Sequence, residues 1–101
     1  MAALEGPRPG KPLADGWAQI RPPEGESGPT LNFETDEHYR PPVWPSIVGE
    51  QAATQHLDIG VDEMDAAVAW AQEKGAVLAD VQPQEGVRVM IDTDGHPFCL
   101  C

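Results

Sequence analysis

A change of hydrophobic period between residues 55 and 75 constrains the fold of this chain more than any other feature. Within residues 55–61, apolar side chains alternate with polar or small ones, as in a strand with one buried face: Leu57, Ile59 and Val61. The apolar side chains that follow recur at helical spacing instead: Met64, Ala67, Val68 and Ala71. The sequence therefore predicts a strand that leads directly into an amphipathic helix.

Residues typical of helix ends flank this periodic stretch. Asp62 is a natural N-cap, and Asp65 stands three positions later, where a capping-box partner belongs. Gly75 supplies the left-handed residue at which helices commonly stop. Alternation then returns in residues 87–92, and the turn at 92–95 leads into a last short strand at 96–101. The order is therefore strand, helix, then strands.

The helix has to cover the apolar side of the sheet, which is the side that carries Leu57, Ile59 and Val61. His56 and Asp58 then lie on the opposite face, and we expect Arg88 and Asp92 to share it. Buried polar groups need partners, so this face either lines a wet cavity or simply meets solvent. Strand parity alone does not choose between these two interpretations.

Composition limits the size and the partners of the protein. A chain of 101 residues is one domain at most. Because 17 acidic residues outweigh 6 basic ones, the formal charge of −11 disfavours nucleic acid and anionic membrane surfaces as partners. No apolar run has the length of a membrane span, and no secretory signal is recognisable. We therefore expect a cytoplasmic protein.

The cysteine content agrees with a reducing compartment. Cys99 and Cys101 are separated by one residue on the same predicted strand, a spacing that rarely closes a disulfide. We expect both to be free thiols.

The first half of the chain is irregular. Three prolines and two glycines in residues 5–13 predict that no strand or long helix forms there. Residues 17–21 and 30–34 are predicted to form a hairpin around a turn-rich segment, with Leu31 and Phe33 facing a core. Three further prolines keep residues 38–45 extended, as in a connector. One P-x-x-P sequence in this connector is weak evidence for a proline-motif ligand.

The chain resembles the vicinal oxygen chelate superfamily, in particular its glyoxalase/bleomycin resistance-like proteins. The resemblance rests on HLDIGVDEMDAAVAWAQEKGA, VRVMIDTDGHPFCL and YRPPVWP, and it extends from Trp17 to Cys101. It implies an α+β fold of two βαβββ modules. Their strands form a curved mixed sheet, a cup around a small-molecule or metal site that is usually completed in a homodimer.

Under this resemblance the chain is a single domain with an incomplete N-terminal module. Residues 1–16 are an irregular N-terminus, 17–37 a remnant hairpin, 38–54 a linker and 55–101 a complete second module. Residues 1–6 resemble the end of the family's first helix, which implies that Met1 is internal to a longer protein; the alternative is an ordinary disordered terminus. The missing first strand leaves an open sheet edge, which favours a homodimer, possibly strand-exchanged in form.

The resemblance also implies positions for metal ligands. His56 matches the histidine of the second module, whereas Cys99 and Asn32 occupy the positions of the two glutamates. One imidazole with a thiol and a neutral amide is a poor site for octahedral metals. We therefore expect no cofactor. The alternative is a divalent metal, Zn, Ni or Fe, held with a further ligand from a partner chain.

The resulting prediction is a small-molecule-binding protein that sequesters a cationic or aromatic compound such as an antibiotic or toxin. The expected ligand-binding residues are His56, Asp58, Arg88, Met90 and Trp17. Ordinary core packing and surface pairing explain the same residues equally simply. One alternative is a metal-dependent lyase, isomerase or dioxygenase, with a site completed by missing residues or by a partner. Another is a non-functional fragment stabilised by dimerisation. The expectation leans away from an enzyme.

Overall fold

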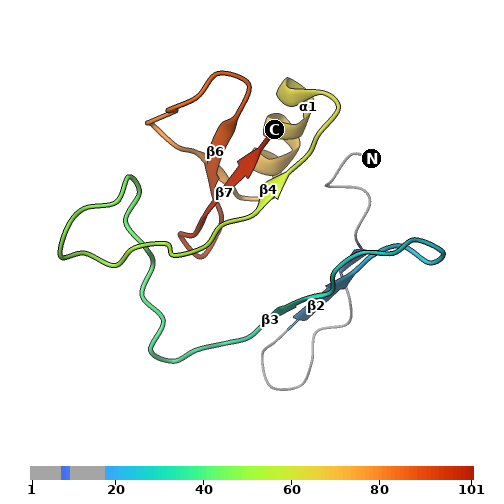
Figure 1. Ribbon diagram of the computed structural model, residues 1–101, viewed down its shortest axis with the longest axis horizontal. Helices are drawn as coiled ribbons and strands as arrows, with labels where there is room; N and C mark the ends of the chain where they lie inside the picture. The colour runs from blue at the N-terminus through green and yellow to red at the C-terminus, as the bar shows by residue number, and fades with distance from the viewer. Residues whose placement is uncertain (1–7, 10–17) are drawn as a thin grey trace.

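The computed structural model describes residues 8–9 and 18–101, and it divides them between two β-sheets (Figure 1). The first sheet has the strand order β1-β2-β3, and the second has the order β4-β7-β6-β5 with one helix, α1. The first sheet consists of β1 (Arg8–Pro9), β2 (Ala18–Arg21) and β3 (Leu31–Phe33). The second unit consists of β4 (Asp58–Ile59), α1 (Met64–Glu73), β5 (Val77–Leu78), β6 (Arg88–Ile91) and β7 (Pro97–Leu100).

The second unit has the βαβββ order that the family resemblance implies, and its strand, helix and later strands follow the order predicted from the change of period. Strand β4 pairs parallel with β7, and β7, β6 and β5 follow as antiparallel neighbours. Backbone hydrogen bonds fasten β4 to β7: the amide of Cys99 donates to Leu57 at 2.8 Å, and the amide of Cys101 donates to Ile59 at 2.9 Å. The predicted α+β fold with a mixed sheet and one helix is confirmed.

The core lies between α1 and one face of this sheet. Met90 and Leu100 are fully buried there, next to Ala71 of the helix. Several partly buried apolar side chains pack around them, including Ile59, Val61, Met64, Ala67 and Val68. The helical spacing therefore identified the correct face of α1. Leu57 is an exception, because 45% of it is exposed. Strand β4 has only two residues, so the alternation predicted for 55–61 does not extend to Leu57.

The ends of α1 differ in how well the sequence located them. The N-cap is Glu63 rather than Asp62, and the side chain of Glu63 makes no capping hydrogen bond. The C-terminal prediction is confirmed, since Gly75 has a φ of +103°. The amide of Gly75 donates to Gln72, and the amide of Ala76 donates to Ala71. Together these bonds form a Schellman motif that satisfies carbonyl groups of the last turn.

The predicted hairpin is present as β2 and β3, in the register Gln19 to Asn32. The prediction that no strand forms within residues 5–13 is wrong, because β1 pairs antiparallel with β2 through Arg8 and Pro9. A proline is tolerated here since β1 is an edge strand of the described sheet.

Strand β3 is the other edge of the first sheet. No described residue pairs with its outer edge. In the second sheet, by contrast, the parallel strand β4 pairs with the outer side of β7. Phe33 on this strand is 48% exposed, which corrects its predicted place in a core. The cause is that the described residues provide no second layer over this short sheet (Figure 1).

The segment between β3 and β4, residues 34–57, folds back onto the turn between β6 and β7. We call this whole segment the connector from here on. The Tyr39 hydroxyl donates to the carbonyl of Asp94 at 2.9 Å. Gly95 in the same turn has a φ of +82°, and a Cβ added to it would lie 2.8 Å from the Cβ of Pro41. The turn itself is held by Asp92, whose Oδ1 accepts hydrogen bonds from the amides of residues 94 and 96. The connector is thus anchored against a hydrogen-bonded turn.

Candidate functional site

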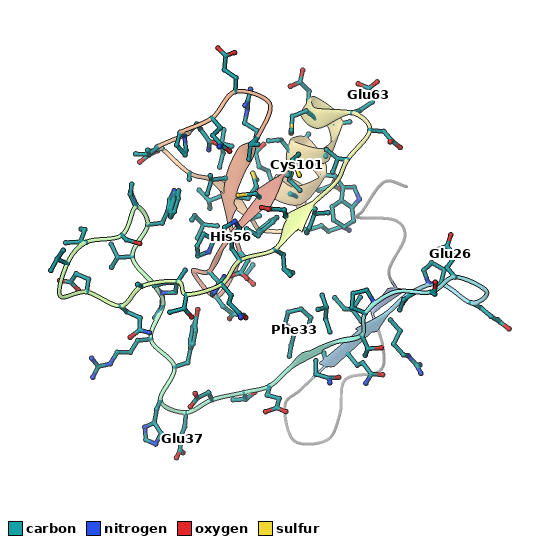
Figure 2. The ribbon with its side chains drawn as sticks, viewed as in Figure 1. Glu26, Phe33, Glu37, His56, Glu63 and Cys101 are labelled. Carbon is teal, nitrogen blue, oxygen red and sulfur yellow. The ribbon has the colours of Figure 1, made fainter. Side chains whose placement is uncertain are left out.

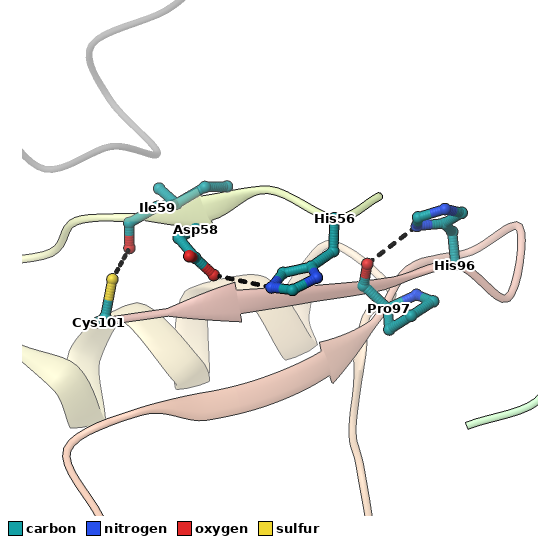
Figure 3. A network of polar contacts seen from close by, with 6 residues as sticks. All are labelled: His56, Asp58, Ile59, His96, Pro97 and Cys101. Carbon is teal, nitrogen blue, oxygen red and sulfur yellow. Dashed lines mark hydrogen bonds and ion pairs between the residues drawn. The ribbon is translucent and has the colours of Figure 1, made fainter. Parts of the chain in front are cut away.

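Strands β4 and β7 bring three polar side chains together on the sheet face opposite α1. Asp58 pairs with Cys99 across the parallel ladder, so both project from the same face. His56 precedes Asp58 by two residues, and its Nε2 lies 3.1 Å from Oδ1 of Asp58 (Figure 3). Both side chains are more than half exposed, at 52% for His56 and 65% for Asp58. We call His56, Asp58 and Cys99 the open-face cluster.

The surroundings of Cys99 raise the pKa of its thiol above the ordinary value. Partial burial is the largest cause of the raised pKa. Smaller contributions come from the charge of Asp58, a hydrogen bond to that carboxylate and the neighbouring Cys101. A thiol with a raised pKa is a weak nucleophile at neutral pH, because the thiolate is the reactive species. Both cysteines are free, as the sequence predicted. The raised pKa therefore does not favour Cys99 as an attacking group.

The donor atoms of the open-face cluster converge enough to hold a metal ion. One ligand atom from each of His56, Asp58 and Cys99 lies within 4.8 Å of the other two. Imidazole nitrogen, carboxylate oxygen and thiolate sulfur are ligand types that Zn²⁺ accepts, and three protein ligands leave a position open. Sequence reasoning had not grouped Asp58 with the metal ligands. Its position two residues after His56 places it near that histidine, but only the pairing of β4 with β7 sets it opposite Cys99.

Two predicted site residues lie on the wrong face for this cluster. Met90 is fully buried in the core beside Leu100, and it pairs with Phe98 across the β6–β7 ladder. Arg88 pairs with Leu100 in the same ladder, so it shares that parity, and its guanidinium donates to the carbonyl of Val87 at 3.0 Å. The expectation that Arg88 and Met90 project from the open face is therefore wrong.

The comparisons with known proteins place the whole chain in one family. A sequence model of the glyoxalase-like domain matches residues 2–101. The chain belongs to the glyoxalase-like domain family. No curated protein and no solved structure matches it. The family resemblance read from the sequence motifs is confirmed, and the βαβββ order of the second unit agrees with it.

The glyoxalase-like chain does not bring all the expected ligand positions together. Asn32 is exposed on β3, in the other sheet, where its Oδ1 accepts a hydrogen bond from Gln19 at 2.9 Å. Figure 2 shows its neighbour Phe33 on the hairpin and His56 on the segment that leads into β4, in separate parts of the molecule. Within the described residues, His56 and Cys99 do lie close together, and Asp58 lies beside them.

Two further expectations meet different outcomes. Trp17 lies outside the described residues, so its predicted contact with a ligand stays a prediction. In the part of the chain that the structure describes, no helix is long and apolar enough to cross a membrane.

Proposed function

We propose that this glyoxalase-like chain binds a small molecule at the open-face cluster, without the complete metal-ligand set of its catalytic relatives. The contacts would come from the His56 imidazole, the Asp58 carboxylate and the Cys99 thiol. Sequestration of an antibiotic or toxin is the biological role that this proposal favours. A cytoplasmic location belongs to the same proposal, supported by two cysteines that remain unpaired.

One observation carries the proposal: the three side chains of the open-face cluster lie close together around the carboxylate of Asp58. Asp58 accepts from the imidazole of His56 at 3.1 Å, and a ligand atom of Cys99 lies within 4.8 Å of both. The carboxylate is thereby oriented, while 65% of the Asp58 side chain stays exposed to an incoming ligand. An oriented and accessible carboxylate is suited to a ligand that donates hydrogen bonds.

Electrostatics favour a cationic ligand. The chain has a formal charge of −11, so its long-range field attracts cations and repels anions. Asp58 is the acidic member of the cluster and lies at its centre. A cationic or aromatic compound that pairs with this carboxylate would experience attraction both at a distance and in contact.

A thermal-shift screen of cationic aromatic compounds tests this proposal. Hits should lose their effect in Asp58→Asn, because the contact charge is gone. The matched control is Asp80→Asn, which removes the same charge at an exposed position outside the cluster. A screen without hits, or hits that survive Asp58→Asn, would count against the open-face cluster as the binding site.

A second candidate function is a metal-dependent lyase, isomerase or dioxygenase, and the convergence of three ligand atoms within 4.8 Å favours it. His56, Asp58 and Cys99 would hold the ion, and a partner chain would complete the site. A bound divalent metal would polarise substrate oxygens. Metal analysis after incubation with zinc, nickel and iron separates the two candidates. Stoichiometric metal that is lost in His56→Ala would overturn the proposal of binding without a metal.

We also propose that the protein forms a homodimer through the first sheet, with exchange of a strand as one form of this assembly. The support is the outer edge of β3, which no described residue pairs with, while the equivalent edge of the second sheet carries β4. Unpaired strand edges readily take up a strand from another chain.

A further inference from the structure

A cavity lies between the connector and the β6–β7 turn. Its volume is about 380 Å³, within the range of ~300–1,000 Å³ typical of small-molecule sites. The side chains that line it come mainly from residues 36–42 and 51–54, and His96 of the turn completes the wall. None of the three residues of the open-face cluster lines it. We call this cavity the connector pocket.

The walls of the connector pocket are fixed to the second unit. The Tyr39 hydroxyl is bonded to the carbonyl of Asp94 at 2.9 Å, and Pro41 rests against Gly95. The amide of Val43 donates to the carbonyl of Gln51 at 2.8 Å, which ties together the two connector segments that form the walls. The pocket is therefore held on both sides before any ligand arrives, which reduces the entropy lost on binding.

The polar groups of the pocket include a cation with no partner among the described residues. Arg40 lines the pocket, and no ion pair or hydrogen bond joins its side chain to another described residue. The side chains of Gln51 and Thr54 also line the pocket without a hydrogen bond to the described part of the chain. One guanidinium with neutral hydrogen-bonding groups is a combination suited to an oxyanion.

His96 contributes an oriented imidazole to the same pocket. Its Nδ1 lies 2.9 Å from the carbonyl of Pro97, which only accepts hydrogen bonds, so Nδ1 carries a proton (Figure 3). Nε2 is then the nitrogen available to a ligand. In the neutral ring Nε2 accepts from a ligand hydroxyl, and in the charged ring it donates to an oxyanion.

One acidic side chain, Asp36, also lines the pocket. Its Oδ1 already accepts the amide of His38 at 2.9 Å, so part of its hydrogen-bonding capacity is used. Arg40 balances its charge, which leaves the pocket close to neutral within a chain of net charge −11. An anion is thus disfavoured by the long-range field and favoured only by contacts inside this pocket.

We propose that the connector pocket binds the carboxylate or phosphate group of a small anionic molecule, with Arg40 as the charged contact and His96 as a second polar contact. This site differs from the proposed open-face site in its residues and in the charge of its ligand, so neither proposal depends on the other.

Calorimetric titration of the full chain with inorganic phosphate, and separately with acetate, tests the proposal at an ionic strength matched with chloride. Saturable binding of at least one anion is expected, and the arm that saturates identifies the phosphate or the carboxylate class. Arg40→Gln should weaken this binding about tenfold or more, since a charge-assisted hydrogen bond is lost. Asp36→Asn should tighten it, because a repelling charge is removed from the pocket wall.

The matched control is Arg21→Gln, which removes the same charge from an exposed position on β2 in the other sheet. It should leave the affinity within about twofold of the wild type, as expected for a distant exposed charge in salt. The proposal is overturned by no saturable binding of either anion. It is equally overturned if Arg21→Gln weakens binding as much as Arg40→Gln, or if Asp36→Asn weakens it.

Discussion

Asp58 and Cys99 lie opposite each other on parallel strands β4 and β7, and the carboxylate of Asp58 raises the pKa of the Cys99 thiol. This pair sets the chemistry of the open face. The carboxylate stabilises the protonated thiol, and the imidazole of His56 shares the same carboxylate at 3.1 Å. A change in Asp58 therefore alters both of its neighbours.

The reactivity of Cys99 gives the first prediction. Burial is the main cause of its raised pKa, and Asp58 adds to it, so Asp58→Asn should lower that pKa without restoring the ordinary value. The pH dependence of alkylation by iodoacetamide measures this change. A Cys101→Ser background leaves Cys99 as the chain's sole thiol. If the alkylation profile is identical with and without the Asp58 charge, that carboxylate does not raise the pKa of Cys99 in solution.

Tyr39 gives a prediction about alkaline pH. Burial raises its pKa above the ordinary value of 10.0, and the charges of Asp92 and Asp94 raise it further. The unfolded chain then loses the phenolic proton first, so stability from the neutral phenol is complete below pH 10 and declines as pH rises through the folded pKa. Because the chain has one tyrosine, ultraviolet absorbance of the phenolate follows this residue alone.

The control for Tyr39 is a pair of charge-removing variants. Asp94→Asn should shift the phenolate titration to lower pH, whereas Asp80→Asn, which is not among the causes of the raised pKa, should leave it in place. Equal shifts in both variants would mean that net charge rather than local geometry raises the pKa.

Gly95 tests the contact between the connector and the β6–β7 turn. Gly95→Ala adds a Cβ 2.8 Å from Pro41 at a φ of +82°, whereas Gly86→Ala has a φ of +72° and no atom within 4 Å of its Cβ. Both variants pay for the left-handed backbone, roughly 1–2 kcal/mol. Gly95→Ala should lose about 1 kcal/mol more because of overpacking. Denaturant unfolding measures the difference. If both variants lose the same free energy of unfolding, Pro41 does not pack against Gly95 in solution.

Met90 separates packing from ligand binding. Met90→Ala should lower the free energy of unfolding by about 2–5 kcal/mol, because it empties a fully buried position beside Leu100. Val77→Ala is the control, since Val77 is 62% exposed on β5 and should change stability little. Chemical denaturation of both variants provides the measurement. If the Met90→Ala protein is as stable as the wild type, Met90 is not a core residue, and the prediction that it projects from the open face would stand again.

The proposed dimer is tested at the edge of β3. Phe33→Lys places a charge on this exposed edge strand, and we expect it to convert a dimer into a monomer in sedimentation velocity experiments. Val77→Lys introduces the same residue at an exposed apolar position on β5, the edge of the other sheet, and should leave the dimer intact. A wild-type chain that sediments as a monomer contradicts the proposed assembly directly.

The sequence predicted those parts of the fold in which one side of an element is apolar and the other is not. The four apolar residues predicted for one face of α1 do pack against the core. The glycine predicted to end the helix has the left-handed backbone that this role requires. The prediction failed in β6, where Val89 and Met90 are adjacent and both buried. A strand that is buried on both faces has no alternation from which to read a face.

The candidate site shows a second limit of sequence reasoning. His56 and Cys99 were recognisable from their family positions, whereas the part played by Asp58 depends on the register that sets it opposite Cys99. Register between parallel strands is fixed by packing along the whole ladder, and no local signal in residues 55–61 specifies it. The connector pocket was missed for a related reason, since it arises from contacts between irregular segments and a distant turn.

The short parallel pairing of β4 with β7 also has a consequence for the order of folding. Helix α1 and the β6–β7 hairpin are built from neighbours in sequence, so their loops close at small entropic cost. Strand β4 has to find a partner about forty residues away, which makes its docking the slow, non-local step. We expect the amides of β7 that face β4 to exchange hydrogen fastest within their strand. The open face would then be the last surface to form and the first to be lost.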